Sequence, residues 1–202
     1  QSPNSQILNP KSPNPKSPNP KSQNPKSQIP ILMLVKTKAI VISTLKFQEK
    51  SLIVKCFTQS HGLKSYFVRN AFSGKKNNQK IAYFQPLSIL EIEAVHKNKG
   101  TLEHFKEIKT AIPFQTIPLD IVKSTMVLFL SEILHHAIHE EEQNEDLFKY
   151  LETALQWLDT HNETSNFHLI LMIEITKFLG FYPDTSDQDL PFFEMNEGVF
   201  SL

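Results

Sequence analysis

The chain has 202 residues, its 21 Lys and Arg balance its 21 Asp and Glu, and it contains one cysteine. A single cysteine excludes an intrachain disulfide framework and a zinc site built from cysteines, and it favours a reducing compartment inside the cell, such as the cytoplasm. The longest apolar run, Ile29 to Val35, contains a proline and is far shorter than the roughly 20 residues that cross a bilayer, so no membrane contact is expected.

The neutral total hides a separation of charge along the chain. Residues 1–30 carry 4 basic and no acidic side chains, residues 31–111 carry 14 and 5, and residues 112–202 carry 3 and 16. A locally basic surface attracts phosphates whatever the total charge is. The distribution predicts a half that binds a polyanion, joined to an acidic half.

Residues 1–32 form a tail of low complexity. Residues 11–30 repeat a five-residue unit, KSPNP KSPNP KSQNP KSQIP, and 8 of the 13 prolines lie in the first 30 residues. Proline at this density removes amide donors and prevents a packed core, so we expect an extended, disordered segment. Two interpretations stay open: a basic tether that adds weak DNA affinity, or a non-essential extension before a true start at Met33.

Residues 33–112 are rich in β-branched and aromatic residues with partial alternation, and they lack helical periodicity. Five strands are predicted, over Val35 to Ser43, Leu52 to Thr58, Leu63 to Asn70, Leu87 to Val95 and Thr101 to Thr110. Five short strands in about 80 residues fit an OB-fold β-barrel with a groove for single strands. An SH3-like barrel is the structural alternative.

Basic and aromatic residues are interleaved along these strands and turns. Ammonium groups for phosphates beside aromatic faces for bases are the usual composition of a groove for single strands. The residues predicted to bind DNA are Lys36, Lys38, Lys46, Lys50, Lys64, Tyr66, Arg69, Lys75, Lys76 and Lys80. The last three crowd one loop, where concentrated like charge adds nothing to folding. The interleaved aromatic residues are Phe47, Phe57, Tyr66 and Phe67. The alternative is that Phe57 and Phe67 belong to the core, as most strand aromatics do, and that the lysines form a solvated face.

Residues 113–202 are predicted to form an all-α helical domain, which makes the chain an α+β protein of two domains after the tail. One helix runs from Leu119 to about Glu141, and a second, capped by Asn144, carries an apolar stripe. The third, about Ser165 to Leu179, is apolar on nearly all sides and is expected to be central and buried.

Two features of this half concern large aromatic residues. Trp157 lies beside the apolar stripe of the second helix and is expected to anchor the helical core. Phe192, Phe193 and Phe200 follow the last helix without a clear pattern and look exposed. Unburied phenylalanines at the end of a chain predict a truncated chain or one that expects a partner.

The only cluster typical of a metal site is formed by His135, His139 and Glu142, which share one helix face. This spacing permits zinc or nickel, but it is not an HExxH motif and no further ligands are obvious. The competing interpretation is a polar helix end with histidines near the negative end of the helix dipole. Because the sequence also has no glycine-rich phosphate loop and no GxSxG motif, we predict no enzyme and no cofactor.

Short motifs follow one another from Met33 onward. They are Ala39–Ile42, Glu49–Val54, Phe57-Thr58, His61-Gly62, Val68–Ala71, Phe84–Leu87, Leu130–Leu134, Glu141–Asn144 and Leu155–Asp159. In their order and spacing, over about 170 of the 202 residues, the chain resembles the RecO family of bacterial DNA repair proteins, in particular its members from Bacteroidota.

This resemblance implies an N-terminal OB-fold, a helical domain and a function. Proteins of this family bind single- and double-stranded DNA and anneal complementary strands. With RecR they help to load RecA onto strands coated by single-strand-binding protein (SSB), whose C-terminal tail they contact, and they are mediators and not enzymes. Many members carry a four-cysteine zinc module in the helical domain. This chain has no cysteine there, so no metal is expected. Members usually continue beyond the point that matches Leu202.

Two other functions stay open from the residues alone. One is a scaffold whose OB-barrel binds proteins and has no direct DNA role. Salt-dependent binding to oligonucleotides of unrelated sequence would distinguish it from a DNA-binding protein. The other is a metal hydrolase built on His135 and His139, which metal analysis of the purified protein would test.

Overall fold

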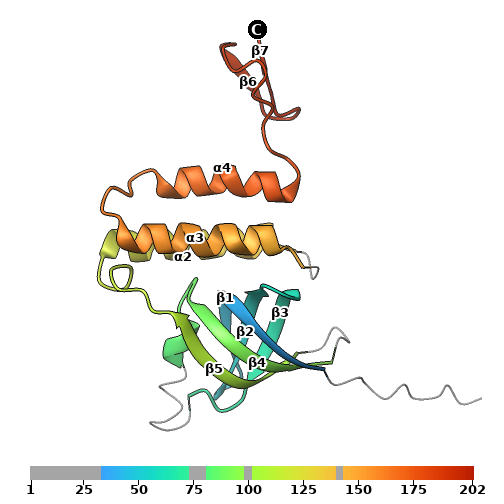
Figure 1. Cartoon of the computed structure of the whole chain (residues 1–202), viewed down its shortest axis with the longest axis vertical. Helices are drawn as coiled ribbons and strands as arrows, with labels where there is room; N and C mark the ends of the chain where they lie inside the picture. Colours follow the sequence, from blue (N-terminus) through green and yellow to red (C-terminus); the bar gives the residue numbers. More distant parts are fainter. Residues whose placement is uncertain (1–32, 73–80, 98–101, 140–142) are drawn as a thin grey trace, which may run out of the picture.

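A computed structural model describes residues 33–72, 81–97, 102–139 and 143–202 (Figure 1). The tail before Met33 and the loop lysines Lys75, Lys76 and Lys80 lie outside the described residues. What was predicted for them stays a prediction.

Five antiparallel strands form one curved sheet in the N-terminal half. They are β1 (Met33–Phe47), β2 (Ser51–Thr58), β3 (Gly62–Val68), β4 (Ile89–His96) and β5 (His104–Ile112), in the order β3-β2-β1-β4-β5. A short 3-10 helix, η1 (Ala82–Phe84), precedes β4. The two edge strands meet at one end, where the Phe67 amide donates to the Glu103 carbonyl at 2.8 Å and the Glu103 amide donates to the Ser65 carbonyl at 2.8 Å. The five predicted strands are confirmed.

Over Ala39 to Ile42 of β1 both faces of the sheet are buried, which explains why this strand alternates only partly in sequence. Ala39 and Val41 of β1 pack with residues of the other strands inside the curve. Their neighbours Ile40 and Ile42 point to the opposite face, since successive side chains of a strand alternate. That face packs on the helices in one continuous core, where Phe57 lies 6.0 Å from Phe148 between ring centroids. The sheet and the helices therefore share an apolar core.

Three helices follow, α2 (Ile121–Ala137), α3 (Glu145–Thr160) and α4 (Phe167–Leu179). The Asp120 side chain accepts from the first amides of α2, and Asn144 accepts from the Leu147 amide, as its predicted capping role requires. Gly180, with φ at 82°, ends α4 in the left-handed conformation that glycine adopts readily. None of the helices in the described ranges has the length and hydropathy of a transmembrane span.

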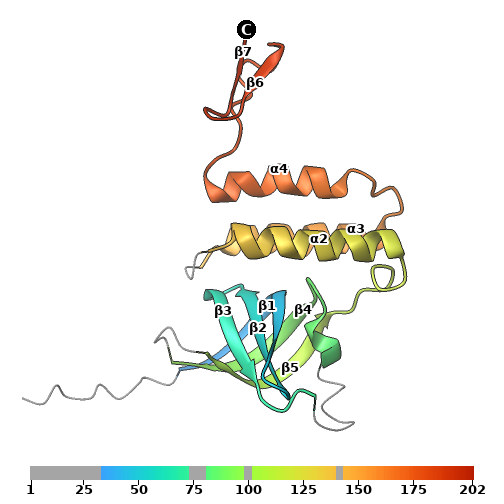
Figure 2. The same ribbon diagram turned by 180° about the vertical axis from the view of Figure 1, so that it is seen from behind.

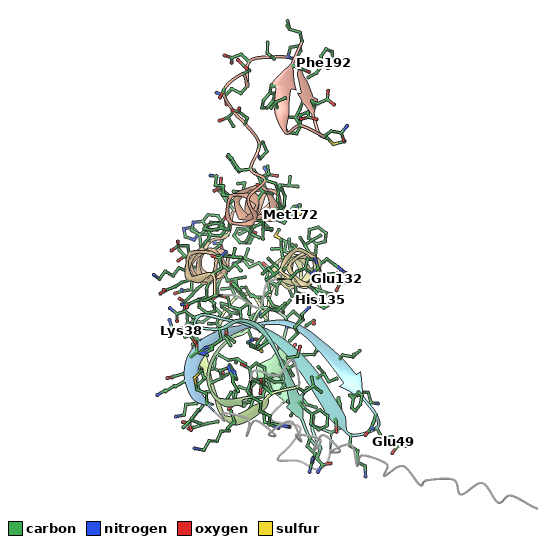
Figure 3. All side chains as sticks on the ribbon, turned by 90° about the vertical axis from the view of Figure 1, so that its right-hand side faces the viewer. Lys38, Glu49, Glu132, His135, Met172 and Phe192 are labelled. Atoms are coloured by element: carbon green, nitrogen blue, oxygen red, sulfur yellow. The ribbon has the colours of Figure 1, made fainter. Side chains whose placement is uncertain are left out.

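The order of the layers differs from the prediction. α2 and α3 lie side by side between the sheet and α4, so α4 is the outermost layer (Figures 1 and 3). Leu169, Ile170 and Ile173 of α4 are 48%, 59% and 52% exposed. The expectation that this helix is central was wrong. Apolar residues all round a helix favour burial but do not determine which element covers them. The sheet occupies the other side of α2 and α3, so α4 packs on them with one face only.

Trp157 also differs from its predicted place in the core. Its ring is 41% exposed, and it stacks on His161 at 4.3 Å and on Phe167 at 5.8 Å between centroids. It covers the junction of α3 and α4 from outside and does not anchor the interior. The side chain next to an apolar stripe lies at the margin of that stripe, which accounts for the half-exposed ring.

A hairpin of β6 (Phe192–Glu194) and β7 (Val199–Ser201) follows α4 and stands apart from the helices (Figure 2). Phe192 and Phe193 are exposed, as predicted, and Phe200 is half-buried. Phe193 and Phe200 contact each other across the hairpin with their ring centroids 5.1 Å apart.

Candidate nucleic-acid interface

The cations predicted to bind DNA do not share one environment. Three lysines, one on β1 and two on β5, are neutralised by glutamates of β4 and β5. Lys36 pairs with Glu91 at 3.2 Å, and beside that pair the glutamates Glu93 and Glu107 hold Lys106 and Lys109, each at 2.9 Å. A surface with alternating charges of both signs attracts a polyanion weakly. We therefore leave Lys36 out of the candidate interface.

Lys38 contributes to the contact between the sheet and the helices. Its Nζ lies 2.7 Å from a carboxylate oxygen of Glu152 on α3. Ser43 of β1 and His135 of α2 form a second polar contact at 3.2 Å, and both Lys38 and His135 face the junction in Figure 3. Burial lowers the pKa of His135, and Lys55 lowers it further. Lys38 therefore contributes to the junction of the two layers, and we leave it out of the candidate interface.

Tyr66 is fully buried, so its predicted role as a stacking platform for bases was wrong. Its hydroxyl lies 2.9 Å from Nε2 of His96, and its ring stacks on Phe105 at 4.2 Å. Burial raises its pKa, with smaller contributions from Cys56 and Glu103. Lys64 lies half-buried at the margin of the same polar cluster. Burial lowers the pKa of His61 and of His96, and the charge of Lys64 adds to this lowering.

The remaining cations gather at the corner formed by the turn after β1 and the turn after β3. We call this surface the cationic corner and define it by Lys46, Phe47, Lys50, Arg69 and Phe72. The Phe72 amide donates to the Lys50 carbonyl at 3.3 Å, which joins the two turns. Each turn contains one residue in the left-handed conformation, Gln48 (φ 55°) and Asn70 (φ 54°), which lets the chain reverse tightly.

Accessible aromatic rings lie among the cations of the cationic corner, and one of them is in contact with a lysine. Nζ of Lys46 lies 5.5 Å from the centroid of the Phe72 ring, a cation–π distance. The Phe47 ring packs edge-to-face on Phe67 at 6.0 Å, and Phe67 meets His104 of β5 at 6.1 Å. Phe47 and Phe72 are 39% and 41% exposed. These rings are therefore accessible to a ligand, unlike Tyr66 and Phe57.

Charge at the cationic corner is not compensated within the structured part of the chain. Lys46, Lys50 and Arg69 are exposed, and no acidic side chain among residues 33–72, 81–97, 102–139 and 143–202 forms an ion pair with them. Glu49 is exposed at the tip of the turn after β1 (Figure 3). Exposed cations beside accessible rings can hold a phosphate backbone and stack on its bases.

Two residues of this region were not singled out by sequence reasoning. Phe72 stands between Arg69 and the lysines at 75 and 76, so an aromatic residue flanked by cations was a signal that could have found it. His104 reaches the Phe67 ring only because the edge strands meet. No local sequence signal indicates that contact.

The candidate metal cluster of His135, His139 and Glu142, which the sequence left as an alternative, has no counterpart in the structured ranges. His135 contacts Ser43 and the ring of His136, His139 is exposed, and Glu142 lies outside the described residues. No group of three or more His, Cys, Asp or Glu side chains with a geometry suited to a metal ion occurs in the part of the chain that the structure describes.

Comparison with known protein families gives a match for the sheet half and another for the helical half of the chain. The family model for the recombination protein O N terminal matches residues 33–114, and the model for the recombination protein O C terminal matches residues 118–200. The chain belongs to the RecO family. The cationic corner lies within the N-terminal RecO segment. The resemblance inferred from the motifs is confirmed, and with it the prediction of a DNA repair and recombination protein that is not an enzyme.

Several curated RecO proteins are similar to this chain. The DNA repair protein RecO of Flavobacterium johnsoniae is 76% identical over 170 residues, which cover 84% of this chain and 72% of that protein. The RecO protein of Flavobacterium psychrophilum is 72% identical over 169 residues, 84% of this chain and 71% of the relative. That of Bacteroides fragilis is 40% identical over 171 residues, 84% of this chain and 70% of the relative.

Proposed function

We propose that this protein is a recombination mediator that binds single- and double-stranded DNA through the cationic corner and anneals complementary strands. The observation that carries the proposal is the set of exposed cations Lys46, Lys50 and Arg69, which lack a described acidic partner and lie beside accessible rings. The curved five-stranded sheet, with its edge strands joined at Tyr66 and Glu103, supports an OB-type barrel as the platform.

The mechanism follows from the placement of charge. Cations at the corner neutralise phosphates of two strands and leave base edges free, so complementary strands meet on one surface without nucleotide hydrolysis. Lys64 and the loop lysines Lys75, Lys76 and Lys80 are proposed to extend this surface. No cofactor is required for such a mechanism.

The acidic helical half is proposed to serve protein partners. Its charge repels DNA, and it shares an apolar core with the sheet, so a partner on the helices is held at a fixed position relative to bound DNA. We propose RecR and the SSB C-terminal tail as direct partners, with RecA loaded indirectly. The site of action is the cytoplasm, on the nucleoid and not on a membrane.

Two triple variants that remove the same charge test this proposal. Changing Lys46, Lys50 and Arg69 to Ala removes cations at the corner, and changing Lys36, Lys106 and Lys109 to Ala removes cations that pair with glutamates. If each corner cation contacts one phosphate, the log–log salt slope for single strands falls by about 2 in the first variant, since each contact contributes about 0.7. Annealing slows accordingly, and the second variant keeps a slope near that of the wild type.

Stability is the necessary control for both variants. Exposed cations contribute little to the free energy of unfolding, so both melting temperatures should remain close to that of the wild type. Equal losses of slope in the two variants would place the DNA elsewhere on the barrel. Absence of salt-dependent binding by the wild type would favour the protein-binding scaffold.

A further inference from the structure

We propose that Phe47 and Phe72 make the cationic corner select unpaired bases over duplex DNA. This inference rests on the proposed function, because it assigns the class of nucleic acid that the same surface prefers. The two rings would act as stacking platforms, while Lys46, Lys50 and Arg69 hold the backbone of any DNA.

The Phe47 ring belongs to an aromatic row that crosses the sheet. It meets Phe67 at 6.0 Å with an interplanar angle of 83°, and Phe67 meets His104 at 6.1 Å with an angle of 82°. Edge-to-face contacts of this kind fix a ring without covering it. Phe47 remains 39% exposed at the end of the row, next to the turn that carries Lys50.

Phe72 presents its ring to a cation and to solvent. Lys46 lies over the ring at 5.5 Å, and 41% of the Phe72 surface is open. Successive side chains of a strand point to opposite faces, so Lys46 with Phe72 and the neighbouring Phe47 lie on two sides of the same strand end. A flexible single strand can follow this end and contact both rings, whereas a stiff duplex cannot.

The chemistry of the ring decides the preference. In a duplex the faces of the bases are covered by their neighbours, and only polar base edges are open in the grooves. Phenylalanine has no polar atom that could read those edges. It gains energy from a base only when the face of that base is free, whereas lysine and arginine contact phosphates of either form equally.

Stacking on DNA requires an exposed ring and, beside it, a cation that is free to bind phosphate. The exposed aromatic rings described in the helical half lack such a cation. Phe129 of α2 is 43% exposed, Phe181 is 64% exposed, and both lie in the acidic half. Lys177 lies over the exposed Tyr182 ring, but it is paired with Glu174. Within the structured ranges, the Phe72 ring at the corner is the accessible ring that lies under a cation without an acidic partner, so charge complementarity points to a polyanion with exposed aromatic bases. The preference also serves annealing, because pairing withdraws bases from the rings and weakens the hold on the product.

Leucine substitutions separate ring chemistry from apolar packing. The variants Phe47→Leu, Phe72→Leu and the double variant are compared with Phe129→Leu, a ring of similar exposure on α2. Three probes are used: oligo(dT) of about 16 nucleotides, a duplex of equal length, and an abasic strand that keeps only the backbone.

Each corner substitution is expected to weaken binding of oligo(dT) by about 5- to 100-fold. Binding of the duplex and of the abasic strand should change by less than about twofold, because phosphate contacts remain. Phe47→Tyr and Phe72→Tyr keep a ring and should restore the preference for oligo(dT). Phe129→Leu should leave all three affinities unchanged.

The outcomes separate this inference from the function on which it rests. If the wild type binds DNA and the Leu variants lose oligo(dT) and duplex equally, the rings only position the cations and the inference fails. Unchanged affinity for oligo(dT) in the folded double variant also overturns it and makes the rings a contact for protein. If the wild type binds none of the probes in a salt-dependent way, the proposed function itself fails.

Discussion

Replacing Asp159 by alanine is expected to destabilise the whole protein, because this carboxylate organises the segment between sheet and helices. Asp159 lies at the end of α3, is 7% exposed, and accepts the amides of Gln115, Thr116 and Ile117 at 2.8–3.1 Å. The Thr116 hydroxyl also donates to the Asp159 carbonyl. Buried Lys123 of α2 completes the network, since its Nζ donates to the Thr116 hydroxyl at 2.7 Å and to the Asp159 carbonyl at 3.2 Å.

The magnitude follows from what the substitution leaves unsatisfied. Burial by itself would raise the pKa of Asp159, but the amide donors hold it below its ordinary value. Hydrogen bonds to a charged group contribute about 1.5–3 kcal/mol each, and breaking a buried charged network costs about 3–5 kcal/mol. We therefore expect Asp159→Ala to lose about 4 kcal/mol of unfolding free energy. For a chain of this size the melting temperature would fall by about 8–16 °C.

Urea denaturation and thermal melting measure the effect, with Asp189→Ala as a control because Asp189 is exposed. A carboxylate whose pKa is depressed by folding stabilises above its unfolded pKa, and this stabilisation is lost as the pH falls below about 4. The acid limb of the stability curve should therefore be shallower in Asp159→Ala than in the wild type. A loss below about 1 kcal/mol, equal to that of the control, would refute this account of the network.

Two further predictions concern buried or half-buried rings. Burial and then the charges of His61 and Lys64 lower the pKa of His96 despite Glu103, so unfolding free energy should decline as the pH falls below about 6.5, the unfolded value. His96→Gln cannot titrate and should flatten this decline in urea titrations between about pH 7 and 5, whereas an unchanged slope would assign it to other histidines. Trp157→Ala should lower the free energy of unfolding by about 2 kcal/mol, because the ring is 41% exposed, whereas loss of a fully buried aromatic ring costs about 3–5 kcal/mol. A loss above about 4 kcal/mol in urea denaturation would contradict the exposed position.

Much of the local structure could be predicted from the sequence. Runs of β-branched and aromatic residues indicated five strands, and Asn144 indicated a helix cap. Apolar residues spaced three and four positions apart indicated three helices. These features depend on residues close together in the chain, where backbone propensity and side-chain period act. The separation of basic and acidic halves is equally local, and the motif order that marks the RecO family is a property of the sequence itself.

Pairing, layering and exposure were decided by the tertiary structure. Lys36 and Lys46 stand on the same strand, yet strand pairing places Lys36 beside Glu91 of β4, whereas Lys46 lies where β1 pairs with β2 alone and extends over Phe72. Tyr66 and Phe67 are neighbours in sequence, but the strand directs Tyr66 into the curve and Phe67 toward the aromatic row. α4 is as apolar as a central helix, but the sheet already occupies the inner side of α2 and α3. Such outcomes depend on contacts between segments distant in sequence, which local pattern does not encode.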